Sequence, residues 1–383
     1  MDNKRSPIEI ASILEACKNE FLGSSKYSSV QKKAYQSIID CRTSKLGGHR
    51  KFCNNCSHTK FAYNSCRNRH CPKCQFIKKE VWMDKLSGNL PPVKYFHLVF
   101  TIPECLNKLF YINQKEAYDL LFKAAGESLK KCAYNTDYLG AKSGAVALLH
   151  TWGQSLSYHP HIHMIVPSGG LTEDNSEWIP SSNKFFVPVK AISKIFRGIL
   201  CKALEDAVRL KKIILPYDTH SFQQLKTKCY KTNWVVYSEK PFANPKNLIK
   251  YLGNYTHRVA ISNQRITSFK DGKVSFTYKD YKNGGFKRVM TLDQNEFTRR
   301  FLQHVLPSGF SKIRYYGFLS LRFINENIEL CCNLLNKSIN ISNLVGLNAF
   351  EVYRYLFNKD PLCCEKCKKG NYEMRTLKNK DST

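Results

Sequence analysis

Hydrophobic and polar positions follow different periods in successive parts of the chain, and these periods predict a mixture of helices and strands. Residues 1–40 place apolar side chains three or four positions apart, which is the spacing of amphipathic helices. From residue 93 onward, short runs rich in aromatic and β-branched residues predict buried strands. We expect these strands at 93–102, 144–150, 159–166 and 234–237. Helical patterns are found at 113–132 and 190–212, and another begins at Pro245.

A basic stretch in the last third of the chain shows a different alternation. Residues 264–292 alternate basic and apolar positions, and two hairpin-turn sequences, Asp271-Gly272 and Asn283-Gly284-Gly285, interrupt them. We therefore expect a three-stranded basic meander. Asp293 and Glu296 form a potential capping box for a helix that follows it.

Composition adds a strong positive charge to this picture. The chain carries 60 Lys and Arg against 30 Asp and Glu, a net charge of +30, which favours a polyanionic partner. Nucleic acid is the first candidate and an acidic membrane surface the second, although charge alone also suits a basic ribosome-like protein. Residues 1–20 lack the apolar run of a signal peptide, and no stretch approaches the roughly 18 apolar residues of a membrane span. We expect a cytoplasmic protein, in which the 16 cysteines serve metal binding or packing rather than disulfides.

The segment 41–75 combines six of these cysteines with three histidines and has little apolar periodicity. Such a segment cannot build a core from its side chains, so it needs a metal in order to fold. Its strongest motif is a pair of Cys-x-x-Cys knuckles, which can place four thiolates tetrahedrally around one zinc ion. We expect the ligands to be Cys53, Cys56, Cys71 and Cys74. A closed four-cysteine site is structural, because it leaves no position open for chemistry.

A second set of potential ligands is interleaved with the knuckles. It consists of Cys41, His49, Cys66 and His70. These residues predict a second zinc ion, or else His70 contacts a DNA phosphate and Cys41 only packs. The segment 41–75 is therefore expected to bind one or two zinc ions and to bind DNA.

A further group of cysteines lies near the C-terminal end. Cys363, Cys364 and Cys367 resemble another knuckle, which Cys331 and Cys332 could complete. A packing role explains them equally well, so we assign no site there. The polar tail that begins at Lys368 is expected to fray.

The run 158–167 carries a His-x-His motif inside a predicted strand. Because side chains alternate along a strand, His161 and His163 point to one face while Ile162 and Met164 point into the core. Two imidazoles at this spacing can hold one metal ion from a rigid element. The competing interpretation is a pair of half-buried histidines without a metal.

The third ligand depends on how this strand pairs. A hairpin with the preceding strand brings His150 alongside, whereas His159 and Gln154 are the alternatives. Three imidazoles leave coordination positions open, as a catalytic metal requires. A metallo-β-lactamase-like site is disfavoured, because Met164 and Ile165 follow the motif where that pattern has Asp.

Two tyrosines in the helical pattern after Pro245 form a second candidate group. Tyr251 and Tyr255 are four residues apart and share one helical face, which is also the spacing of an ordinary core stripe. A phenol, with a pKa near about 10, is a poor nucleophile at neutral pH, so it needs a metal that polarises the scissile phosphate. A covalent phosphotyrosine conserves the phosphodiester energy, and two tyrosines allow two strand ends to be held at once.

Several runs in this chain resemble rolling-circle insertion-sequence transposases of the two-tyrosine HUH class. The zinc-binding head of that class is similar to the run from Cys41 to Gln75, which contains Gly47-Gly48-His49 and both knuckles. The resemblance continues, in the same order, through the runs 96–103, 150–154, 159–170, 251–265 and 314–319. It covers roughly residues 30 to 367.

The resemblance implies an α+β fold, with a ferredoxin-like HUH nuclease core around an antiparallel central sheet, preceded by a helical and zinc-binding segment. It implies Mg²⁺ or Mn²⁺ on His161 and His163, with His150 as our choice of third ligand. It also implies a 5′-phosphotyrosine on Tyr251 or Tyr255, and single-stranded DNA of transposon ends and target as substrate. No helicase motif accompanies the nuclease, so host replication or helicase machinery must unwind the DNA.

The patterns and the resemblance together predict four consecutive regions. They are a helical segment at 1–40, a zinc-binding DNA-binding domain at 41–90, an HUH nuclease domain with the tyrosine helix at 91–262, and a basic β-meander with a helical C-terminal region at 263–383. The expected phosphate contacts, for which a solvated basic face is the alternative, are Arg258, Arg265, Lys287 and Arg288.

The leading hypothesis is a bacterial-type, nucleoid-associated transposase, and the sequence leaves open whether it forms a homo-oligomer. A plasmid or phage replication initiator, or a relaxase, is the alternative that shares the nuclease core. A non-enzymatic zinc-dependent nucleic-acid-binding protein is the alternative from another class. Formation of a covalent protein–DNA adduct distinguishes the enzymes from the binding protein.

Overall fold

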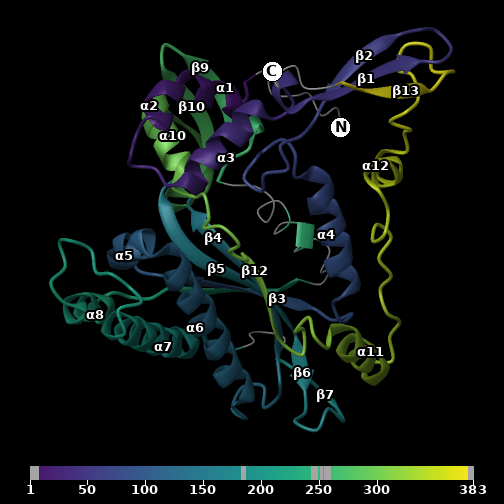
Figure 1. Cartoon of the computed structure of the whole chain (residues 1–383). Coiled ribbons are helices and arrows are strands. Elements are labelled where there is room, and N and C mark those ends of the chain that lie inside the picture. The colour runs from purple at the N-terminus through teal and green to yellow at the C-terminus, as the bar shows by residue number, and fades with distance from the viewer. Residues whose placement is uncertain (1–7, 183–186, 243–248, 251–252, 254–259, 378–383) are drawn as a thin grey trace. The chain divides into compact units, whose positions relative to one another are not determined.

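The computed structural model describes residues 8–182, 187–242, 249–250, 253 and 260–377 (Figure 1). The chain forms two compact units, each assembled from segments distant in sequence. Unit 1 comprises Met1–Asp84, His257–Val305 and Asn343–Thr383, and unit 2 comprises Lys85–Thr256 and Leu306–Ser342. Within the described ranges, none of the helices combines the length and apolar character that crossing a bilayer requires.

Unit 2 is organised around a five-stranded antiparallel sheet with the strand order β12-β4-β5-β3-β8. Its strands are β3 (Tyr95–Thr101), β4 (Gly144–Trp152), β5 (Tyr158–Pro167), β8 (Val236–Phe242) and β12 (Ile313–Gly317). The expected α+β fold with an antiparallel central sheet is thereby confirmed. The predicted strands correspond to β3, β4, β5 and the beginning of β8, whereas β12 has no counterpart among them.

Helices cover one face of this sheet and form the main hydrophobic core with it (Figure 1). They are α5 (Asn107–Ile112), α6 (Gln114–Tyr134), α7 (Val189–Arg209) and α8 (Phe222–Lys231). Ile162 and Met164 of β5 are fully buried in this core, as the alternation predicts. The side chains of His161 and His163 therefore lie on the opposite face of the sheet. Unit 2 also contains β6 (Gly169–Leu171), β7 (Trp178–Pro180) and α11 (Ile324–Leu334).

The helices predicted at the start of the chain pack, within unit 1, against a helix from much later in the sequence. This group consists of α1 (Ile10–Ala16), α2 (Lys18–Leu22), α3 (Ser29–Asp40) and α10 (Gln294–Leu302). The hydroxyl of Tyr35 donates a hydrogen bond to the carbonyl oxygen of Leu14. Nε2 of Gln31 donates to the carbonyl oxygen of Leu302 at 3.0 Å and so joins α3 to α10.

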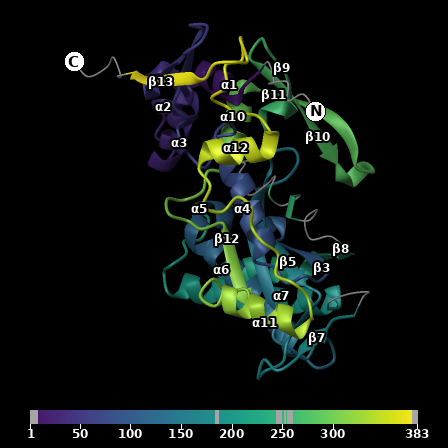
Figure 2. The same ribbon diagram turned by 90° about the vertical axis from the view of Figure 1, so that its right-hand side faces the viewer.

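The basic meander of unit 1 is confirmed. Strands β9 (Ile266–Lys270), β10 (Lys273–Asp280) and β11 (Phe286–Asp293) pair antiparallel in the order β11-β10-β9, and Figure 2 shows β10 and β11 as an extended hairpin. At its turn, Gly284 and Gly285 have φ values of 77° and 74°. Glycine adopts this left-handed region without the steric cost of a Cβ.

The helix cap after the meander differs from the expected capping box. The side chain of Asp293 accepts a hydrogen bond from the backbone N–H of Asn295, as an N-cap residue should. The carboxylate of Glu296 is instead hydrogen-bonded to Arg299 and Arg300. The reciprocal bond is therefore lost to stronger charge-assisted partners on the same helix.

A second sheet of unit 1 joins a strand of the C-terminal segment to two strands of the cysteine-rich segment. It contains β1 (Gly48–Cys53), β2 (Thr59–Tyr63) and β13 (Tyr372–Leu377) in the order β13-β1-β2 (Figure 1). β13 pairs antiparallel with β1 over their full lengths. The expectation that the tail frays from Lys368 is therefore wrong as far as Leu377, because β1 satisfies the backbone groups of β13. The described part of the chain also contains the helices α4 (Phe76–Gly88) and α12 (Ala349–Phe357).

Candidate metal centres

Three histidines on neighbouring strands of unit 2 converge on the sheet face opposite the helices. β4 and β5 form the predicted hairpin, with His150 directly opposite His161. The ring centroids of His150 and His163 are 4.1 Å apart, and those of His161 and His163 are 4.8 Å apart. One ring nitrogen from each of the three lies within 4.8 Å of the others. His159 does not belong to this cluster.

Hydrogen bonds orient two of these imidazoles. Nδ1 of His161 donates to the carbonyl oxygen of His159 at 2.6 Å. Nδ1 of His163 lies 2.8 Å from Nε2 of His97, a buried residue of β3 whose ring stacks on His163 at a centroid distance of 5.0 Å. Because both Nδ1 atoms are engaged within the protein, Nε2 of His161 and Nε2 of His163 are the atoms that can face a metal.

Burial keeps the three histidines uncharged at neutral pH. Desolvation lowers the pKa of His161 to about 3 and holds the pKa values of His150 and His163 well below their ordinary range. A metal-binding imidazole must be neutral, since a protonated nitrogen has no lone pair to offer. Three neutral, convergent nitrogen donors on rigid strands thus fit a divalent metal ion with open coordination positions.

The candidate nucleophiles Tyr251 and Tyr255 lie outside the described residues, and so does Arg258. Arg265 lies in unit 1, where its Nε donates to the carbonyl oxygen of Thr277 at 2.7 Å. Lys287 and Arg288 are exposed on β11, and Arg288 forms an ion pair with Asp280 at 3.3 Å. All three residues therefore stay predictions as DNA contacts.

The cysteine-rich head forms a first cluster in unit 1 from the residues around the second knuckle. Its members are Cys41, Cys66, Cys71 and Cys74. Their sulfur atoms lie within 4.8 Å of one another, and those of Cys66 and Cys74 are 3.6 Å apart. Cys41 directly follows α3, and its sulfur accepts from the backbone N–H of Cys66 at 3.5 Å. The interleaved set predicted from the sequence thus supplies half of this cluster.

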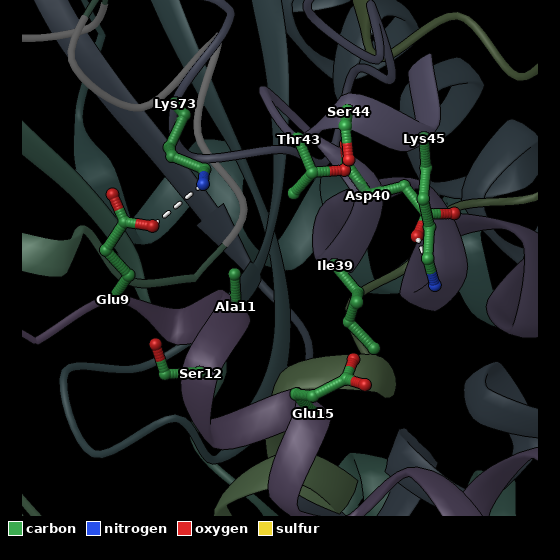
Figure 3. A pocket seen from close by; sticks show the side chains of 10 residues that line it. All are labelled: Glu9, Ala11, Ser12, Glu15, Ile39, Asp40, Thr43, Ser44, Lys45 and Lys73. Atoms are coloured by element: carbon green, nitrogen blue, oxygen red, sulfur yellow. Dashed lines mark hydrogen bonds and ion pairs between the residues drawn. The ribbon is translucent and has the colours of Figure 1, made fainter. Parts of the chain in front are cut away.

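An ion pair connects this cluster to α1. Lys73, in the turn between Cys71 and Cys74, pairs with Glu9, the N-cap residue of α1, at 2.8 Å (Figure 3). Lys73 lines a pocket of about 360 Å³. A second lysine in the pocket lining, Lys45, forms an ion pair with Asp40 at 3.6 Å. Because both lysines already face carboxylates, this pocket is unsuited to a DNA phosphate.

The first knuckle belongs to a different cluster. Cys53 and Cys56 lie with two cysteines from the C-terminal segment, Cys364 and Cys367. The expected single site of Cys53, Cys56, Cys71 and Cys74 is therefore wrong, because the two knuckles lie in separate clusters. Neither His49 nor His70 belongs to a cluster, and Nδ1 of His70 lies 3.1 Å from the side-chain oxygen of Asn68.

Sequence patterns missed two features of these centres. His97 lies in one of the runs that carry the family resemblance, but nothing in its spacing connects it to His163. Cys364 and Cys367 have knuckle spacing, but nothing local indicates which cysteines complete their site. In both cases, strand pairing brings together residues that are distant along the chain.

Comparisons with known proteins all identify transposases. Residues 144–327 match the family model described as "Putative transposase", and residues 13–102 match the model described as "Transposase zinc-binding domain". The chain is 42% identical over 318 residues to "Putative transposase y4qJ" of Sinorhizobium fredii, covering 82% of this chain and 80% of that one. It is 28% identical over 333 residues to the transposase for insertion sequence element IS801 of Pseudomonas savastanoi pv. phaseolicola, covering 86% and 80%.

Proposed function

The chain belongs to the two-tyrosine HUH transposases of the IS91 and IS801 type, with their zinc-binding domain, and on that premise we propose how it acts on DNA. It nicks single-stranded DNA at the ends of its element and rejoins it to a target, through a 5′-phosphotyrosine intermediate and a rolling-circle route. The observation that carries this proposal is the convergence of His150, His161 and His163 on one sheet face.

The histidine centre would hold the metal that serves cleavage. When bound, a divalent ion polarises the phosphoryl oxygens of the scissile phosphate and orients the leaving group. His150, His161 and His163 would hold this ion from paired strands, and the contact of His97 with Nδ1 of His163 would leave Nε2 of His163 for the metal. The hydrophobic core beneath β4 and β5 restrains both strands and so keeps the donors in place.

A tyrosine carries out the covalent step. The phenolic oxygen of Tyr251 or Tyr255 attacks phosphorus, and the bond from phosphorus to the 3′ oxygen breaks. The phenolic proton passes to solvent, and the released 3′ oxygen takes up a proton to become a hydroxyl. Rejoining reverses these events with a 3′ hydroxyl of another strand, so the number of phosphodiester bonds is conserved and no ATP is needed.

The donor set bears on the choice between Mg²⁺ and Mn²⁺. Mg²⁺ prefers oxygen ligands and loses its hydration water reluctantly, whereas transition metals accept imidazole nitrogen more readily. A centre of three histidines should therefore use Mn²⁺ at lower concentrations than Mg²⁺. Water and phosphate oxygens would be available for the positions that the three histidines leave open, so Mg²⁺ would also be able to serve.

A covalent-adduct assay tests the proposal. The full chain is incubated with single-stranded oligonucleotides from the ends of its element and Mn²⁺, and the products are separated under denaturing conditions. We expect a protein–DNA adduct that requires both the metal and the strand containing the element end. Oligonucleotides of scrambled sequence serve as the control. Absence of any adduct with the correct ends would contradict the proposed chemistry.

A further inference from the structure

The second cysteine cluster joins two parts of unit 1 that are far apart in the chain. Cys53 and Cys56 flank the turn after β1, while Cys364 and Cys367 form a knuckle shortly before β13. The zinc-domain match ends at residue 102 and the transposase match ends at residue 327, so neither match reaches the second pair. We propose that these four thiolates bind a second structural zinc ion, which closes the C-terminal segment onto β1.

The sulfur separations fit a tetrahedral zinc site. Sγ of Cys53 is 3.6 Å from Sγ of Cys367, and Sγ of Cys56 is 3.7 Å from Sγ of Cys364. Zinc–sulfur bonds of about 2.3 Å in a tetrahedron separate the sulfurs by about 3.8 Å. A disulfide requires about 2.05 Å, so these contacts are those of a shared metal rather than of cystine bridges.

The surrounding backbone is arranged for thiolates. The backbone N–H of Asn55 donates to Sγ of Cys53, and that of Gly370 donates to Sγ of Cys367, both at 3.4 Å. Such bonds stabilise the negative charge that a four-thiolate site carries. The two turns also approach closely, since a Cβ on Gly370 would lie 2.7 Å from Sγ of Cys53 and 2.5 Å from Cβ of Asn55. Glycine is therefore the residue that this approach allows.

The cluster has its own small core, separate from the first cysteine cluster. Cys53, Cys364 and Tyr372 are buried together, and Cys56 and Cys367 pack beside them. So few apolar side chains cannot hold a strand by packing alone. A zinc ion supplies the missing free energy, because it crosslinks the segment to β1 at the point where the pairing of Cys53 with Tyr372 begins.

Substitution with cobalt tests the site in the full-length chain. Co²⁺ bound by thiolates shows sulfur-to-metal charge-transfer absorption, to which the histidine centre does not contribute. We expect the wild-type chain to show this absorption for two ions. The double variant Cys364→Ser/Cys367→Ser should lose about half of it, and Cys53→Ser/Cys56→Ser should lose the same half. All four replacements together should remove no more than either pair does.

Two further variants keep this test decisive. Cys363→Ser replaces the neighbouring cysteine outside the cluster and should retain the full absorption. Cys367→His should retain both ions but shift the spectrum toward three sulfur donors and one nitrogen, which reports on the site even if the serine variants do not fold. Full absorption in Cys364→Ser/Cys367→Ser, or an unshifted spectrum in Cys367→His, would overturn the proposal.

Proteolysis tests whether the metal closes the segment. Trypsin cleaves after Lys368, which precedes β13, and after Arg375, which lies within it. In the presence of Zn²⁺, the variant Cys364→Ser/Cys367→Ser lacks this ion whereas Cys363→Ser retains it, so we expect cleavage there to be at least about tenfold faster in the double variant. Equal rates would show that the zinc does not hold β13 in place. Neither readout depends on DNA cleavage, so failure of this inference is distinguishable from failure of the proposed function.

Discussion

Replacing His97 with phenylalanine tests how the histidine centre is held. Nε2 of His97 lies 2.8 Å from Nδ1 of His163, and the two rings stack at a centroid distance of 5.0 Å. Phenylalanine preserves a planar aromatic ring at the stacked position but removes the nitrogen. Nδ1–H of His163 then loses this partner in a buried position, at a cost of about 1–3 kcal/mol.

We expect this loss to weaken Mn²⁺ affinity by about 10- to 100-fold, as is usual when the outer partner of a metal-bound histidine is removed. That range corresponds to about 1.4–2.7 kcal/mol. Titration with Mn²⁺, followed by electron paramagnetic resonance of the free ion, measures the affinity directly. Adduct yield should recover at saturating Mn²⁺, because His97 positions a ligand and does not itself contact DNA. The amide oxygen of His97→Gln should accept from His163 and restore part of the affinity.

The matched control is His304→Phe, which makes the same replacement at another buried histidine, in unit 1. It should leave Mn²⁺ affinity unchanged. Circular dichroism establishes that both variants are folded. Unchanged affinity in a folded His97→Phe variant, or an equal loss in both variants, would refute the reasoning.

Three further predictions concern the tyrosines, the metal ligands and the basic meander. Replacing Tyr251 and Tyr255 with phenylalanine should abolish the covalent adduct while leaving DNA binding, measured by fluorescence anisotropy, within about twofold; an undiminished adduct would place the nucleophile elsewhere. His161→Ala should eliminate Mn²⁺-dependent adduct formation, because two imidazoles remain of three; retained activity would mean that the metal binds at another site. Lys287→Ala/Arg288→Ala should lower the slope of log affinity against log salt by about 0.7 per lost phosphate contact on single-stranded DNA. An unchanged slope would assign both residues to a merely solvated face.

Local patterns predicted much of the candidate active site, because strand periodicity depends only on neighbouring residues. The alternation in β5 placed Ile162 in the core and His161 on the opposite face, and the structure agrees. Hairpin pairing then brought His150 alongside, as expected. His97 was not identified, because its contact with His163 depends on the pairing of β3 with β5, and the two residues are 66 positions apart.

The same limit applies to the helices and the tail. The pattern in residues 1–40 predicted amphipathic helices, but α10 as their packing partner could not be foreseen from it. The polar composition after Lys368 suggested fraying, although β13 is held by backbone hydrogen bonds to β1 that do not depend on side-chain polarity.

The sequence by itself determined that the head of this chain binds zinc, that a strand presents two histidines on one face, and that the chain carries the charge and motifs of a transposase. The first two conclusions depend on spacing within a few residues, and the third depends on the net charge and on the resemblance of several runs to a known transposase family. Only the tertiary structure decided which cysteines share a site, and it placed Cys53 and Cys56 with Cys364 and Cys367. Coordination depends on the distances between sulfur atoms in space, and the pairing of β1 with β13 makes those distances short across more than 300 residues of chain.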